Sequence, residues 1–171
     1  MKLTVREIAV FGLLGALMCA SDLAMEALPN IHLIGVFIVA TTVVYRAKAL
    51  WPLYVYVLLI GLISGIGLWW IPYLYVWTVL WGVTMLLPKN MPKWLAPIVY
   101  MAVCALHGLL FGVLYAPSQA LLFGFTFKQT LAWIAAGFPF DVIHAVGNTV
   151  SGLLICPLIA LLRKTKEPIE R

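Results

Sequence analysis

The sequence predicts an all-α membrane protein in which six transmembrane helices form a single bundle over residues 1–171. Two observations of composition support this prediction. Hydrophobic residues make up 64% of the chain and charged residues 10%, with a mean hydropathy of +1.07. A soluble domain carries roughly 25% charged residues, because its surface must face water. Most of this surface is therefore expected to face lipid.

The third observation is the distribution of the basic residues, which sets the expected topology. If the apolar segments cross a membrane, ten of the 11 Lys and Arg residues fall on one side: Lys2, Arg6, Arg46, Lys48, Lys89, Lys93, Arg163, Lys164, Lys166 and Arg171. Only Lys128 falls on the other side. Basic residues near span ends are retained in the cytoplasm, so we expect an even number of spans with both termini cytoplasmic. The net charge of +5 is divided among loop ends, which favours anionic lipid over nucleic acid as a partner.

The first span is predicted over residues 4–27. Thr4-x-x-Glu7 has the pattern of a capping box, in which two side chains satisfy free amides of the first helical turn. The helix is expected to end before Pro29, because proline and the residue before it disfavour a continuing helix.

The next three spans are predicted over residues 31–46, 49–66 and 71–87. The second is short compared with the ~20 residues that cross a bilayer. Glycines cluster after the third span, which indicates close helix contact or an unwound exit. The fourth span stops at Pro88.

The fifth and sixth spans are predicted over residues 94–116 and 139–162, with a long extracytoplasmic loop at 117–138 between them. A seventh span in this loop would place the basic C-terminal segment outside, against the charge rule. We expect a short helix at about 127–136 that folds over the bundle, since long loops in compact domains are commonly lids or binding loops.

Polar side chains in the outer half of the bundle are the main candidates for ligand binding, because ionisable groups within a membrane are costly unless they are paired or hydrated. Asp141, His144 and Asn148 are spaced i, i+3, i+7 and so share one helix face. They could hold a ring that carries hydrogen-bond donors and acceptors. The alternative is that Asp141 stabilises the helix start while the other two bond neighbouring helices.

Two further features point to the same end of the bundle. Asp22 and Glu26 are four residues apart near the end of the first span, where they could attract a cationic group or simply mark the helix exit. Tyr73, Trp77 and Trp81 form a stripe on one face of the fourth span. This stripe suits stacking against a flat ligand, or alternatively an aromatic belt at headgroup depth.

Several chemistries have no motif in the chain. There is no phosphate-binding G-x-x-x-x-G-K-S/T loop, no HExxH and no pair of cysteine ligands, so we expect no ATP hydrolysis by that route, no metal and no cofactor. The small residues Gly12, Ala16 and Ala20 recur every four positions on the first span. Such a face allows another helix to approach closely, or simply packs within the bundle.

In length, span layout, the Ala16-x-x-x-Ala20 motif and the sequence from Pro139 to Asn148, the chain resembles the S components of energy-coupling factor (ECF) transporters. The resemblance implies a non-enzymatic, substrate-binding subunit for uptake of a vitamin or similar micronutrient in a prokaryotic cell membrane. It also implies partners, namely a transmembrane coupling subunit and two cytoplasmic ATPases, with Ala16 and Ala20 in the docking face. By position, the expected substrate-binding residues are Glu26, His32, Trp70, Tyr73, Trp77, Asp141, His144 and Asn148.

The ligand is expected to be a small neutral or cationic heteroaromatic compound, because acids and aromatic residues outnumber the single outer lysine. Two other classes of function remain open at this point. A stand-alone transporter or channel would accumulate its substrate without an ATPase partner. A membrane enzyme would use Asp141 and His144 as acid and base, although no nucleophile or metal triad accompanies them.

Overall fold

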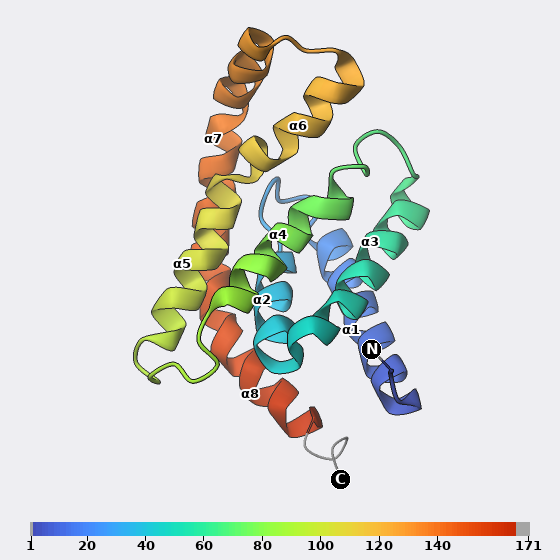
Figure 1. Ribbon diagram of the computed structural model, residues 1–171, viewed down its shortest axis with the longest axis vertical. Helices are drawn as coiled ribbons and strands as arrows, with labels where there is room; N and C mark the ends of the chain where they lie inside the picture. Colours follow the sequence, from blue (N-terminus) through green and yellow to red (C-terminus); the bar gives the residue numbers. More distant parts are fainter. Residues whose placement is uncertain (1, 167–171) are drawn as a thin grey trace.

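The computed structural model describes residues 2–166, so Arg171 of the predicted basic tail lies outside the described residues. About 80% of the chain is helical and the described part contains no strand, which confirms the all-α prediction. Figure 1 shows the helices in one bundle. The elements are α1 (Val5–Ala24), α2 (Ile34–Tyr45), η1 (Arg46–Ala49), α3 (Leu50–Ser64), α4 (Tyr73–Leu86), α5 (Ala96–Leu109), α6 (Phe111–Phe123), α7 (Phe127–Ser151), η2 (Gly152–Leu154) and α8 (Ile155–Lys166).

One end of the bundle, called here the basic end, collects cationic side chains from distant parts of the sequence: Arg46, Lys48, Lys89, Lys93 and Arg163. Lys48 forms a salt bridge with Glu7 in the first turn of α1. Glu7 also completes the expected capping box with Thr4, which confirms the predicted start of this helix.

The opposite end, called here the cavity end, is marked by Asp22, Glu26, Trp69 and Tyr73. The chain reverses direction between the two ends after each of α1, α2, α3 and α4 and between α6 and α7, whereas α5 continues into α6 and α7 into α8 (Figure 1). For example, α3 begins beside the Glu7–Lys48 pair and brings Tyr56 to Asp22 in the last turn of α1, where the phenol donates a hydrogen bond of 2.9 Å. The sharp reversal between α2 and α3 occurs at Arg46, whose φ is 54°.

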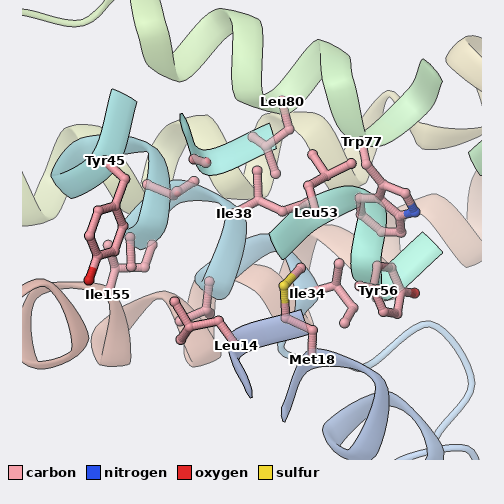
Figure 2. Packing of buried hydrophobic residues seen from close by; sticks show 14 of the residues in the cluster. Leu14, Met18, Ile34, Ile38, Tyr45, Leu53, Tyr56, Trp77, Leu80 and Ile155 are labelled. Atoms are coloured by element: carbon pink, nitrogen blue, oxygen red, sulfur yellow. The ribbon is translucent and has the colours of Figure 1, made fainter. Parts of the chain in front are cut away.

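Helix α2 is the centre of the core. Ten of its 12 residues are buried, whereas the other helices bury mainly one face. Figure 2 shows Ile34 and Ile38 of α2 between Met18 of α1, Leu53 of α3 and Leu80 of α4. The absence of charged residues from α2 is explained by this position, since a charge there would have no access to water.

The outer surface of the bundle is apolar, as expected for a protein in lipid. Leu13, Leu62, Ile98 and Val146 are each more than half exposed. By length and composition, four helical stretches among residues 2–166 could cross a membrane: Val5–Ala24, Ile34–Ser64, Ala96–Phe123 and Phe127–Lys166. The shorter α4 is also apolar. The second stretch contains the reversal at Arg46, so it comprises two helices rather than one straight rod.

The expectation of a long loop at 117–138 is wrong. Helix α6 continues to Phe123, and α7 begins at Phe127 and runs without interruption to Ser151. The two helices form an antiparallel hairpin that extends beyond the link between α3 and α4 (Figure 1). The sixth helix therefore starts at 127 rather than 139, and the fifth continues past 116 after a break at Leu110.

Local chemistry explains this difference. Pro117 and Pro139 both lie inside helices, so neither acts as the stop signal that was expected from proline. The actual break is at Gly124, which adopts a left-handed conformation with φ 67° and ends α6. Thr126 and Gln129 then form a capping box that starts α7. The pattern Thr126-x-x-Gln129 in the sequence therefore marks the start of α7.

We expect the substitution T126A to loosen the start of α7. The Thr126 hydroxyl accepts a hydrogen bond from the backbone amide of Gln129, and loss of such a cap costs about 1 kcal/mol. Hydrogen exchange of the first turns of α7 should therefore accelerate by about fivefold. The matched control is T149A, because Thr149 is an exposed threonine near the opposite end of the same helix. Equal effects of the two variants would contradict the capping role.

Candidate functional site

Two adjoining hollows open at the cavity end and share Asp22, Glu26 and Tyr73. The larger has a volume of about 320 Å³ and is also lined by Ile60, Ser64 and Trp69. The smaller has a volume of about 180 Å³ and reaches down to His32, Phe111 and His144. The larger hollow alone is within the ~300–1,000 Å³ typical of small-ligand pockets.

The link between α1 and α2 forms one wall of the smaller hollow. After α1 ends at Ala24, the chain passes Glu26 and turns at Asn30, whose φ of 60° is in the left-handed region. Asparagine tolerates this conformation better than most residues. The turn directs His32 inward, where it lines the hollow immediately before α2 begins.

The mouth of the cavity is acidic. Asp22 is partly buried and accepts the hydrogen bond from Tyr56, while Glu26 is exposed in the turn that follows α1. Within the described part of the chain, neither carboxylate forms a salt bridge. The single outer lysine, Lys128, is exposed near the start of α7. The mouth therefore favours a ligand that is cationic or that donates hydrogen bonds.

The inner part of the site is a layer of imidazole and aromatic rings. The ring centroids of His32 and His144 are 4.7 Å apart, those of His32 and Trp77 are 5.5 Å apart, and those of Phe111 and His144 are 5.0 Å apart. On the far side of Trp77 lies His107, at 5.5 Å between ring centroids. Four elements and the α1–α2 link contribute these rings, so their proximity is produced by the fold.

Four nitrogen atoms in this layer are buried without a hydrogen-bond partner in the protein: Nδ1 of His32, Nε1 of Trp77, Nδ1 of His107 and Nε2 of His144. Most buried polar groups in proteins are paired, so each exception needs an explanation. The side chains of His32 and His144 also line the smaller hollow, and the unpartnered nitrogens are buried beside it. The combination of a hollow and unpartnered polar groups at its inner end is the strongest indication of a binding site among the described residues.

The three polar residues of α7 are all buried on one face, as their spacing predicts, but they have different partners. Asp141 accepts a hydrogen bond of 3.0 Å from the amide of Gly112, and the Asn148 amide donates one of 3.0 Å to the carbonyl of Cys104. Asn148 thus bonds a neighbouring helix, as its alternative interpretation expected. Asp141 bonds α6 from the middle of α7, so the alternative that it stabilises a helix start is wrong. Only His144 lines the cavity.

The aromatic stripe of α4 faces the interior of the bundle, so an aromatic belt is the wrong interpretation for it. Tyr73 lines both hollows, whereas Trp77 is 1% exposed and lies beneath it, with 5.6 Å between their ring centroids. Trp81 donates a hydrogen bond to the carbonyl of Arg46, near the basic end. Trp70 donates to the carbonyl of Val57 in α3 and does not line either hollow.

Sequence reasoning missed three members of the site. Trp69 lines the larger hollow in the place expected for Trp70. Phe111 was not considered, because a phenylalanine in an apolar helix carries no distinguishing signal. His107 was not among the expected binding residues; its Nε2 bonds the carbonyl of Val76, and its ring lies beside Trp77. The available signal was an ionisable side chain within an apolar segment, since such residues are uncommon there.

The expected docking face of α1 lies on the outside of the bundle. Ala16 and Ala20 are exposed, and a Cβ atom built on Gly12 would meet nothing within 4 Å. The opposite face of α1 packs on α3, where Gly15 lies against Val55. The small residues at these three positions are therefore not explained by packing inside the chain.

Among residues 2–166, no group of three or more His, Cys, Asp and Glu side chains is arranged to hold a metal ion. The candidate site thus consists of two adjoining hollows with an acidic mouth and an inner layer of rings. Compared with protein-family models, with curated proteins and with solved structures, the chain gives no match.

Proposed function

We propose that this protein is the substrate-binding membrane subunit of an ECF-type, ATP-driven uptake transporter. The observation that carries the proposal is the cavity lined by His32 and His144, each of which also has a buried nitrogen without a hydrogen-bond partner in the described part of the chain. A pocket with apolar and aromatic walls and a few convergent polar groups is typical of small-molecule binding.

The proposed substrate is a small neutral or cationic heteroaromatic micronutrient, such as a thiamine-like compound, a pyrimidine or a modified purine. A flat ring fits beside Tyr73 and Trp69, which are 5.5 Å apart between ring centroids in an edge-to-face arrangement. Donor groups or positive charge on the ligand would face Asp22 and Glu26 at the mouth.

The proposed topology has six membrane crossings, with the basic end and both termini in the cytoplasm. Its support is the alternating direction of the helices and the collection of Arg46, Lys48, Lys89, Lys93 and Arg163 at one end. The cavity then opens to the outside. Ala16 and Ala20 on the exposed face of α1 would dock the transmembrane coupling subunit, to which two cytoplasmic ATPases bind.

The direct test is binding by the purified chain without partner subunits. We expect denaturation of the purified protein to release a co-purified small molecule, which mass spectrometry then identifies. Compounds from a panel of thiamine analogues, pyrimidines and modified purines should raise the melting temperature, since a ligand at 100 times its Kd stabilises a protein by about 2.7 kcal/mol. Aromatic carboxylates are the control and should have no effect. The proposal would be contradicted if no small molecule is released and no compound of the panel stabilises the protein.

A further inference from the structure

A hollow with a volume of about 530 Å³ lies at the basic end. It lies between the α4–α5 link, the first turn of α5 and the outer face of α8. Three cationic side chains, Lys89, Lys93 and Arg163, face it, together with Asn90 and Tyr100. Nothing in the proposed transport function uses these residues, because the substrate cavity is at the other end of the bundle.

Among residues 2–166, no acidic side chain lines this hollow. The one salt bridge in the described part of the chain joins Lys48 to Glu7, which lie in a separate hollow. Ala96 and Pro97, in the first turn of α5, also line the basic hollow. The positive end of the α5 dipole therefore adds to the field of three cations. A bound anion would relieve the repulsion among them.

The remaining lining of the hollow is apolar. Ala96, Pro97, Ile159 and Ala160 form this part of the wall between α5 and α8. Next to it in sequence, Trp94 is 72% exposed and Ile98 is 60% exposed. Tryptophan is enriched at headgroup depth in membranes. The hollow thus joins a cationic rim to an apolar surface, which matches a molecule with a phosphate headgroup and a hydrocarbon chain.

We propose that this hollow binds the phosphodiester headgroup of an anionic phospholipid, such as phosphatidylglycerol or cardiolipin, with an acyl chain along the exposed face of α5. Lys89, Lys93 and Arg163 hold the phosphate, and Asn90 and Tyr100 are close enough to line the same hollow. The site depends on the membrane location of the chain but not on the identity of the transported substrate.

The test compares lipid retention by two variants that lose the same charge at the same end. The first, K89Q/K93Q/R163Q, changes the hollow. The second, K2Q/R6Q/K164Q, changes exposed cations that do not line it. Each protein is purified in detergent and titrated with phosphatidylglycerol, cardiolipin or phosphatidylcholine, and bound lipid is counted by native mass spectrometry. Melting temperatures without lipid verify that both variants are folded.

We expect the wild type to bind both anionic lipids and to discriminate against phosphatidylcholine. Each cation near an anionic lipid surface contributes about fivefold, so the first variant should bind roughly a hundredfold more weakly. The control should stay within about fivefold of the wild type. Equal losses in the two variants, or unchanged binding in the first, would overturn the site. Inorganic phosphate could stabilise the wild type as much as the anionic lipids do, and K89Q/K93Q/R163Q could lose this stabilisation. That result would show that the hollow binds a soluble anion and would overturn the lipid proposal.

Discussion

The substitution H144L is expected to weaken ligand binding by about 30-fold, measured as Kd by isothermal titration with the compound that best stabilises the wild type. His144 lines the smaller hollow, and its Nε2 is buried without a hydrogen-bond partner in the described part of the chain. A ligand that hydrogen bonds to this nitrogen would lose its partner and remain buried, at a cost of about 2 kcal/mol. Leucine retains apolar volume, so the loss would report the hydrogen bond rather than a cavity.

The matched control for this variant is H107L. His107 belongs to the same ring layer but does not line the hollows at the cavity end. Its Nε2 bonds the carbonyl of Val76, so its removal should lower the melting temperature and change the Kd by less than about threefold. If H107L weakens binding as much as H144L, the two effects arise from general disruption of the core. Unchanged affinity in H144L would remove His144 from the site.

The double substitution A16L/A20L should stop transport while ligand binding persists. Both alanines are exposed on α1, and Leu side chains there would prevent a partner helix from approaching closely. A clash of about 1–3 kcal/mol would reduce assembly, and hence uptake of labelled substrate by cells, by roughly five- to 150-fold. The Kd of the isolated subunit should not change, because the cavity end does not include these residues.

A control with A102L/A135L places the same side chains at two other exposed alanines, one on α5 and one on α7. Uptake by this variant should equal that of the wild type. If both double variants lose uptake, the added bulk acts through expression or insertion rather than through docking. Normal uptake by A16L/A20L would show that the small residues of α1 do not form a docking face for a partner subunit.

The limits of prediction from sequence are clear in the helices. The start of α1 was predictable because Thr4 and Glu7 satisfy backbone groups locally, and local interactions can be recognised from adjacent residues. The extent of α6 and α7 was not, because the charge rule assigned residues 117–138 to a loop, whereas the two helices continue through Pro117 and Pro139. In apolar surroundings a helix retains its backbone hydrogen bonds wherever possible, so neighbouring turns accommodate a proline.

The site was predictable in kind but not in detail. Spacing placed Asp141, His144 and Asn148 on one buried face, yet it could not show which of them would find a partner in α5 or α6. That outcome depends on Gly108 and Gly112, where the backbones approach closely enough for side chains of α7 to bond main-chain atoms. Such pairings join residues about 30 to 45 positions apart in sequence and are products of tertiary packing.

The hairpin of α6 and α7 also has a practical consequence. A chain of 18.9 kDa is small for single-particle electron microscopy and offers few features for alignment. The turn of the hairpin, at Gly124, lies away from the basic end and from the exposed face of α1 (Figure 1). Exposed turns of this kind tolerate insertions. A rigid fusion partner or an antibody epitope inserted there would add mass while leaving the rest of the bundle unaltered.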